Sequence, residues 1–148
     1  MENTTWDGLP ISSEEPHGAA VLTWRSGPNG REWLILHRAH QGPDFEGDWA
    51  WTPPSGARLP GEAIEECARR ELFEETGMRL DISPTAFGSE GWAIFIAEAP
   101  ATSDVVLDAE HDRFLWASSE EAVVRCLPDH VGASFRLAAR ALDDHSPR

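Results

Sequence analysis

Three glutamates near the end of one predicted helix are the residues best suited to chemistry. Glu71, Glu74 and Glu75 occupy positions i, i+3 and i+4. With ~100° of rotation per residue, Glu71 and Glu75 fall among the apolar side chains of that helix, and Glu74 falls at their edge. Because an apolar stripe normally faces the core, burial of these carboxylates would be costly without a compensating positive charge.

A divalent cation would remove that cost. Like charges four residues apart on a helix repel by ~0.2–0.5 kcal/mol, and the helix dipole disfavours anions near the C-terminal end. Arg70 can neutralise only one of the three carboxylates. Carboxylate ligands favour Mg²⁺ or Mn²⁺. The pattern therefore predicts a metal site, with a structural network of ion pairs as the alternative.

The helix that must position these glutamates is predicted over residues 60–76. Pro60 and Gly61 stand at its start, and acidic residues fill its first turns. Gly77 stands where a helix commonly ends in a left-handed glycine.

Strands and helices alternate irregularly along the rest of the chain, with a turn at residues 26–30 that predicts a hairpin. Strands are predicted at residues 19–24, 33–37, 49–52, 92–97 and 113–117, and helices at residues 130–142 and after Ser118, which opens a capping box with Glu121. This mixture predicts one α/β-type domain over residues 18–148, preceded by a flexible N-terminal arm at residues 1–17.

Charge and composition exclude several classes of function. The 148 residues carry 26 acidic and 12 basic side chains, a formal net charge of −14, which disfavours nucleic acids and anionic membranes as partners. All basic residues are arginine, so Schiff-base chemistry and a phosphate-loop lysine are excluded. No membrane helix or signal peptide is evident, which predicts a cytoplasmic protein. Cys67 and Cys126 are then expected to be buried thiols rather than a disulfide.

Residues 56–78, GARLPGEAIEECARRELFEETGM, resemble the signature of the Nudix hydrolase family. The positions that match are Gly56, Glu62, Arg70, Glu71, Leu72, Glu74, Glu75, Gly77 and Met78. The resemblance implies a fold of the α/β (α+β) class, an α/β/α sandwich in which helices flank a mixed sheet.

The resemblance also implies roles for these residues. Glu71, Glu74 and Glu75 would bind Mg²⁺ or Mn²⁺, assisted by a backbone carbonyl near Ser55 and Gly56. Glu62 and Arg70 would pair and, with Gly56 and Gly77, hold the motif in shape. The implied reaction is hydrolysis of a nucleoside diphosphate linked to another moiety, with Glu71 or Glu75 accepting a proton from the attacking water.

Two flanking segments, WAWTPPSG at residues 49–56 and EHDRFLW at residues 110–116, are similar to the Nudix branch that cleaves diadenosine polyphosphates. Under this likeness Glu110 is an additional metal ligand or catalytic carboxylate, and Phe114 stacks on a base. The alternatives are a solvated Glu110 and a core Phe114. Ser55 stands where that branch has lysine, so one cationic phosphate contact is missing, and Arg58 or Arg38 would have to substitute for it. Ser55, Arg58 and Phe114 are the substrate-binding residues that the likeness implies.

Several functions stay open at this level. A dinucleoside polyphosphate is favoured as substrate; nucleoside triphosphates, ADP-ribose and nucleotide sugars are alternatives. The same motif would suit a non-catalytic domain that senses a nucleotide, or a structural metal-binding domain. A homodimer is a further option, because apolar strands such as residues 92–97 fit either a core or an interface.

Overall fold

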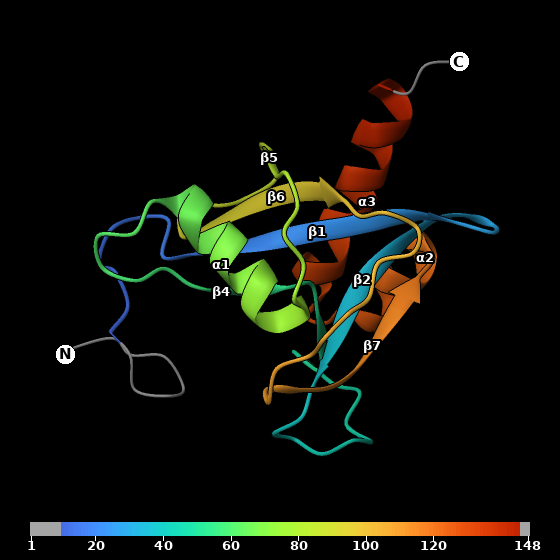
Figure 1. The fold of residues 1–148 in the computed structure, drawn as a ribbon, viewed down its shortest axis with the longest axis horizontal. Coiled ribbons are helices and arrows are strands. Elements are labelled where there is room, and N and C mark those ends of the chain that lie inside the picture. The colour runs from blue at the N-terminus through green and yellow to red at the C-terminus, as the bar shows by residue number, and fades with distance from the viewer. Residues whose placement is uncertain (1–9, 146–148) are drawn as a thin grey trace.

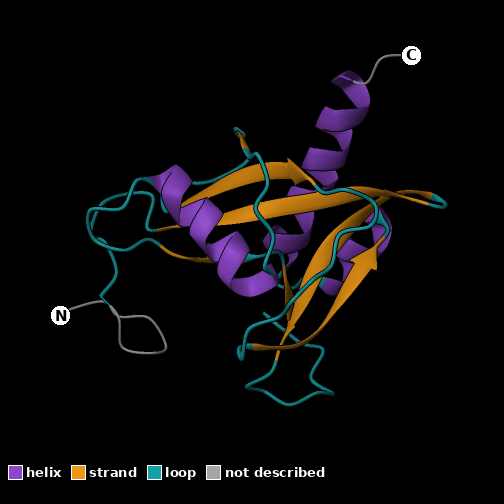
Figure 2. Cartoon of the chain, viewed as in Figure 1, coloured by secondary structure: helices purple, strands orange, loops and turns teal. Residues whose placement is uncertain are grey.

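The computed structural model describes residues 10–145. The predicted N-terminal arm lies mostly in residues 1–9, outside the described residues. A seven-stranded mixed sheet is flanked by three helices, which confirms the predicted fold class (Figures 1 and 2). The elements are β1 (Gly18–Gly27), β2 (Gly30–Arg38), β3 (Trp51–Thr52), β4 (Ser55–Ala57), α1 (Ile64–Thr76), β5 (Ser83–Pro84), β6 (Trp92–Glu98), β7 (His111–Ala117), α2 (Ser119–Arg125) and α3 (Asp129–His145).

The sheet has the order β3-β2-β1-β6-β5, with β4 paired to β1 and β7 paired to β2. Strands β1 and β6 run parallel, and the other pairs are antiparallel. Strand β2 therefore has β7 along one edge, and β1 followed by β3 along the other. Its end, at Arg38, lies between the segment that leads into β3 and the start of β7.

Two cores cover the two faces of the sheet. Helix α1 lies over one face, while α2 and α3 lie over the other (Figure 1). On β2, Leu34 and Leu36 pack toward α1, whereas Trp33 and Ile35 pack toward α2 and α3. Because strand side chains alternate between faces, a continuous apolar run such as this is buried on both sides.

Helix α1 ends as predicted but begins later. The amide of Gly77 donates to the carbonyl of Phe73 at 2.8 Å, and Gly77 has φ 75°, the left-handed cap expected of glycine. The predicted start at Pro60 is wrong by four residues. Gly61 has φ 77°, so the chain makes a turn before Ile64 instead of entering the helix.

The other predicted strands and helices are present, with small changes at their ends. The hairpin is confirmed, with Gly27 opposite Gly30, and Ser118 caps α2 by accepting a bond from the Glu121 amide at 3.2 Å. Both cysteines are buried and free, as expected. Strands β4 and β5 escape prediction from the sequence because each is at most three residues long and is defined by its partner strand. No helix in residues 10–145 is long and apolar enough to cross a membrane.

Candidate metal and catalytic site

Four potential ligands from two distant parts of the chain converge on the α1 side of the sheet. They are Glu75 near the end of α1, Asp108 and Glu110 before β7, and His111 at the start of β7. One donor atom from each residue lies within 4.8 Å of the donors of the others. Three carboxylates and an imidazole in this arrangement can hold a divalent cation. We call these residues the acid cluster.

Two of the four residues in the acid cluster were predicted from the sequence. Glu75 and Glu110 are candidates on motif grounds, whereas Asp108 and His111 are not. The imidazole Nδ1 of His111 lies 2.8 Å from Asp108 Oδ1, which orients the ring. Burial lowers the pKa of His111, with Arg38 acting in the same direction and Asp108 opposing, and the neutral imidazole is the form that binds metals. The signal available in the sequence is the density of ligand-type residues in Asp108-Ala109-Glu110-His111.

Glu75 is a buried carboxylate in need of a cation. It is only 3% exposed, and its Oε1 accepts one bond from the Ser55 amide at 2.9 Å. Burial raises its pKa well above the ordinary value, and the neighbouring charges of Glu71, Asp108 and Glu110 raise it further. An ion held by the acid cluster would reverse this penalty, so the donor set fits a bound divalent cation.

Glu71 lies beside the acid cluster. Arg70 Nη1 donates to its Oε1 at 2.7 Å. Burial nevertheless raises the pKa of Glu71 to about 7, with Arg70 opposing and the charges of Glu74 and Glu110 adding to the shift. The carboxyl group packs so closely on Gly56 that any Cβ at position 56 would overlap it. Glycine at position 56 thus lets the Glu71 carboxyl group keep this position, which a larger residue would force it to leave.

Glu74 is placed differently from its two neighbours. Its side chain is 53% exposed, and its Oε2 lies 3.3 Å from Arg70 Nη1. It is not among the four converging donors. Metal binding by Glu74 stays a prediction, and the acid cluster forms without it.

Arg70 pairs with Glu62 and so joins α1 to the loop before it. Its Nε lies 2.7 Å from Glu62 Oε2 and its Nη2 lies 2.9 Å from Glu62 Oε1, while Nη2 also donates to the carbonyl of Ala57 at 2.8 Å. Burial alone would raise the pKa of Glu62, but the bonds from Arg70 and the Leu59 amide outweigh it and lower the pKa. Such two-point pairing with arginine specifies geometry as well as charge.

The predicted substrate residues occupy different surroundings. Ser55, in β4, reaches the acid cluster through its backbone amide. Arg58 is engaged elsewhere: its guanidinium donates to the carbonyl of Glu62 at 2.6 Å and to those of Glu15 and Pro16 at 3.4 Å. Substrate binding by Arg58 would therefore have to compete with these bonds.

Phe114 is exposed beside a buried neighbour. It lies opposite Leu36 in the β2–β7 ladder, which places both side chains on the α1 face, and it is 40% exposed. Trp116, two residues on, packs against the core beneath α1. Of these two aromatic residues, Trp116 thus serves the core and Phe114 offers a ring to solvent.

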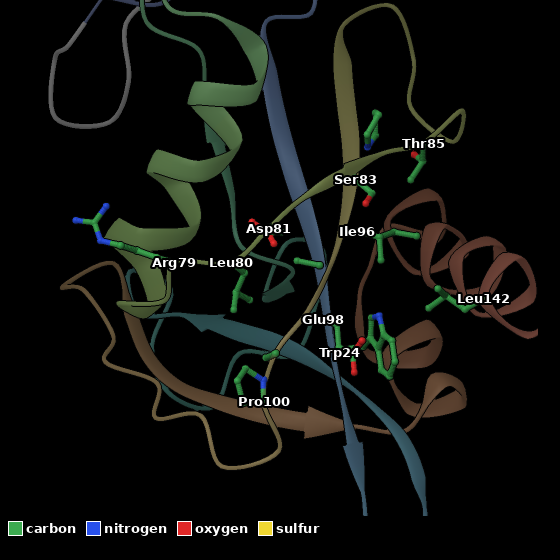
Figure 3. Close-up of a pocket in the computed structure, with 13 residues that line it drawn as sticks. Trp24, Arg79, Leu80, Asp81, Ser83, Thr85, Ile96, Glu98, Pro100 and Leu142 are labelled. Atoms are coloured by element: carbon green, nitrogen blue, oxygen red, sulfur yellow. The ribbon is translucent and has the colours of Figure 1, made fainter. Parts of the chain in front are cut away.

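A separate cavity of about 770 Å³ opens at the other end of the sheet, between β5, β6 and α3 (Figure 3). Trp24, Ile96 and Leu142 supply apolar parts of its lining, and Asp81 and Glu98 supply acidic parts. None of its lining residues belongs to the acid cluster, so this cavity is distinct from the candidate site.

The NUDIX domain family model matches residues 16–138. A putative 8-oxo-dGTP diphosphatase 3 of Mycobacterium tuberculosis is 32% identical over 133 residues, covering 78% of this chain and 58% of that protein. An octanoyltransferase of Myxococcus xanthus is 30% identical over 140 residues, covering 82% of this chain and 36% of that protein. The chain thus spans between about a third and three fifths of these curated relatives.

Among solved structures, an Ap4A hydrolase of C. elegans is similar in fold. It superposes with a TM-score of 0.71 at 24% identity, covering 86% of this chain and 98% of that one. At that identity the likeness concerns the fold alone. Because the family model covers most of the sequence, with the motif helix and the acid cluster inside the matched range, this chain belongs to the Nudix hydrolase family.

Proposed function

We propose that the protein hydrolyses the pyrophosphate linkage of a nucleoside diphosphate joined to another moiety. The observation that carries this proposal is the convergence of Glu75, Asp108, Glu110 and His111 beside Glu71. A divalent cation in the acid cluster would bind phosphate oxygens and offset the repulsion between an acidic protein and an anionic substrate.

Mg²⁺ or Mn²⁺ is the proposed ion. Three of the four donors are carboxylates, and oxygen-rich sites prefer these cations over softer metals. Glu75 and His111 are buried and lie at fixed positions, which suits ligands. We assign Glu110 to the same ligand set, and leave Glu74 as a ligand of lower importance because it lies outside the acid cluster.

We assign the general base to Glu71. Glu71 is not among the four converging donors, but it lies close enough to the acid cluster for the charge of Glu110 to raise its pKa. In the metal-free protein burial raises the pKa of Glu71 to about 7, and a cation bound in the acid cluster would lower it again, so that the buried carboxylate would be ionised and able to accept a proton. In this scheme a water oxygen bonds to phosphorus as its proton passes to the Glu71 carboxylate, and the bridging P–O bond breaks with the leaving phosphate taking the electron pair.

Dinucleoside polyphosphates are the proposed substrate class. The flanking segments at residues 49–56 and 110–116 resemble the diadenosine polyphosphate branch, and Phe114 presents an exposed ring on the same face as the acid cluster. Nucleoside triphosphates are the second candidate, favoured by the similarity to the mycobacterial 8-oxo-dGTP diphosphatase. A purely sensing domain is disfavoured because every carboxylate of the motif is present.

The test is a substrate panel of diadenosine tetraphosphate, nucleoside triphosphates including 8-oxo-dGTP, and ADP-ribose, each with Mg²⁺ and with Mn²⁺. Chromatography should show diadenosine tetraphosphate converted to ATP and AMP, with Glu71→Gln inactive under the same conditions. A preference for a nucleoside triphosphate would support the proposed pyrophosphate hydrolysis but would contradict dinucleoside polyphosphates as the substrate class. Bound metal without turnover of any compound would favour the sensing function instead.

A further inference from the structure

Trp49 differs sharply from Trp51, two residues along the chain. Trp51 is 3% exposed and packs in the core beneath α2 and α3, whereas Trp49 is 43% exposed. Trp49 also has φ 67°, the left-handed region that bulky residues rarely adopt. Its amide donates to the carbonyl of Leu127 at 2.6 Å, which holds the backbone in this conformation. An unfavourable backbone that keeps a large ring in solvent points to binding rather than to packing.

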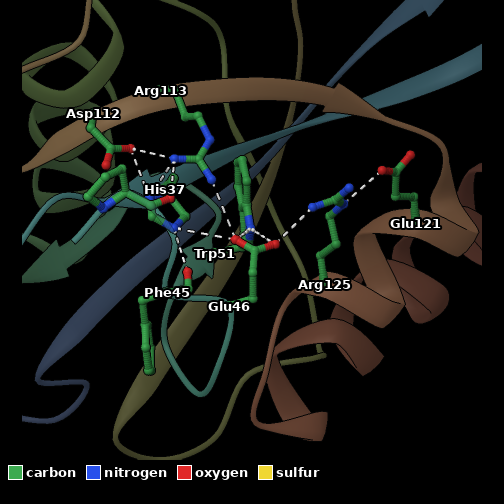
Figure 4. Close-up of polar contacts among 9 residues, drawn as sticks. His37, Phe45, Glu46, Trp51, Asp112, Arg113, Glu121 and Arg125 are labelled. Atoms are coloured by element: carbon green, nitrogen blue, oxygen red, sulfur yellow. Dashed lines mark hydrogen bonds and ion pairs between the residues drawn. The ribbon is translucent and has the colours of Figure 1, made fainter. Parts of the chain in front are cut away.

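The loop that carries Trp49 is firmly held although it lies on the surface (Figure 4). The buried ring of His37 lies between two acceptors, with Nδ1 2.8 Å from Asp112 Oδ1 and Nε2 2.7 Å from the carbonyl of Phe45. Arg113 Nη1 donates to the carbonyl of Pro43 at 2.7 Å. Residues 43–45 are thus fixed to β2 and β7.

Glu46 adds further contacts to this loop. Its carboxylate accepts bonds from the indole Nε1 of Trp51 at 3.1 Å and from Arg125 Nη1 at 3.0 Å. The guanidinium groups of Arg113 and Arg125 lie 5.2 and 5.5 Å from the Trp51 ring centroid. Trp51 and its charged neighbours therefore serve to hold the loop, which leaves Trp49 as the member of the pair that is available to a ligand.

Arg38 connects Trp49 to the acid cluster. Its amide donates to the carbonyl of Ala50 at 2.9 Å on one edge of β2, and Arg38 pairs with His111 on the other edge. The backbone next to Trp49 is thus two strand spacings, roughly 10 Å, from the start of β7. The Arg38 guanidinium carbon lies 6.0 Å from the Trp49 ring centroid, and the ring of His130, from α3, meets Trp49 edge-on at 5.6 Å.

We propose that Trp49, Arg38 and His130 bind the aromatic ring of the second moiety of the substrate, on the opposite side of the phosphate chain from a base stacked on Phe114. The ligand is a planar nucleobase joined through its sugar to the phosphate chain. Trp49 supplies a face for stacking, and Arg38 supplies a cation between that ring and the phosphates. This proposal rests on the proposed function, because it requires a substrate that spans the acid cluster.

The test compares diadenosine tetraphosphate with adenosine 5′-tetraphosphate, which lacks one adenosine. Trp49→Asn removes the ring and suits the left-handed backbone better than tryptophan does, so its melting temperature should not fall. Because loss of base stacking usually weakens binding severalfold or more, kcat/KM for the dinucleotide should fall roughly tenfold, mainly through KM. For adenosine 5′-tetraphosphate the change should stay below about twofold, and Trp49→Phe should restore most of the preference.

Phe73→Ala is the matched control. Phe73 is another exposed aromatic residue with a guanidinium against it, since Arg79 lies 4.0 Å from its ring centroid, but its side chain is on the outer surface of α1. Phe73→Ala should leave kcat/KM unchanged for both substrates. An equal loss on both substrates in Trp49→Asn, or no loss on either, would overturn the proposal.

Failure of the proposed function would give a different result. In that case the wild-type protein would hydrolyse neither compound, and titration calorimetry with the same two compounds would still test the subsite. Trp49→Asn should then bind diadenosine tetraphosphate roughly tenfold more weakly than the wild type and adenosine 5′-tetraphosphate about equally. Equal affinities of the two proteins for the dinucleotide would overturn the subsite.

Discussion

Two regions of this molecule gather acidic side chains near a histidine, and they treat the charges in opposite ways. Around His37, the carboxylates of Asp112 and Glu46 meet an imidazole and the guanidinium groups of Arg113 and Arg125. In the acid cluster, Glu75 accepts a single backbone N–H and its pKa is driven upward by other carboxylates. The charges of the first arrangement are balanced by side chains of the protein itself, whereas those of the second would be balanced by a bound cation.

The comparison shows how a structural ion network can be distinguished from a binding site. Counting acidic residues does not separate the two regions, because both contain several. What separates them is whether partners from the chain itself balance the charge. The same change, from carboxylate to the isosteric amide, should therefore have opposite effects on stability in the two regions.

The largest effect is expected from Glu75→Gln. Loss of this proposed metal ligand should reduce turnover by roughly 10³-fold or more, since metal-assisted charge stabilisation is worth several kcal/mol. The metal-free variant should be more stable than the wild type, because a repelled buried charge is removed while the amide oxygen can still accept from the Ser55 amide. Urea unfolding in chelator, beside steady-state kinetics, checks both parts. A less stable metal-free variant would contradict this account of the acid cluster.

The second prediction concerns the pH dependence of the metal-free protein. Between pH 4.5 and about 7 the folded state keeps a proton on Glu71 that the unfolded state has lost, so stability is full below this window and falls as pH rises through it. The shift corresponds to about 3 kcal/mol at most. In urea unfolding with chelator, Glu71→Gln should become more stable than the wild type as pH rises across this range, and saturating Mg²⁺ should reduce that difference. The lowered pKa of His111, which acts in the opposite direction, is common to both proteins and cancels in the comparison. A difference between the two proteins that stays constant with pH in chelator would be inconsistent with this shift.

In the ion network around His37, the same kind of substitution should lower the stability instead of raising it, and by a smaller amount. Asp112→Asn removes the charge that faces His37 Nδ1 at 2.8 Å while it keeps the shape of the side chain. Because hydrogen bonds to charged groups are worth about 1.5–3 kcal/mol and an acceptor oxygen remains, the free energy of unfolding should fall by about 1 kcal/mol. Denaturation with and without Mg²⁺ should show the same loss. A gain in stability would remove the distinction between the two regions.

The smallest effect on stability is expected at Phe114. Phe114→Ala should raise KM severalfold, change kcat little, and alter the free energy of unfolding by less than about 1 kcal/mol, because the ring is already 40% exposed. Trp116→Ala, on the same face of β7 but packed on the core, is the contrasting variant and should mainly destabilise the protein. A Phe114→Ala protein that unfolds readily yet keeps its KM would assign that ring to the core.

Short-range patterns in the sequence predicted much of this structure. The apolar stripe of α1 with carboxylates inside it, the left-handed cap at Gly77 and the hairpin between β1 and β2 all follow from residues close together in the chain. The late start of α1 was not predicted, although it too depends on residues close together in the chain. Gly61 was available as a signal, but proline and glycine before a helix suit both a first turn and a loop, and only the backbone distinguishes them.

The sequence by itself thus determined the family, the fold class and the presence of carboxylates that are costly without a cation. The tertiary structure decided which residues join them, because the chain at the start of β7 brings Asp108 and His111 close to Glu75. It also decided that the Arg58 guanidinium donates to backbone carbonyls. Finally, it decided that Trp49 is exposed while Trp51 is buried. The physical reason is range. Helical periodicity and turn preferences act over a few residues, whereas the meeting of α1 with β7, and of Arg38 with Trp49, depends on how distant segments pack on the sheet.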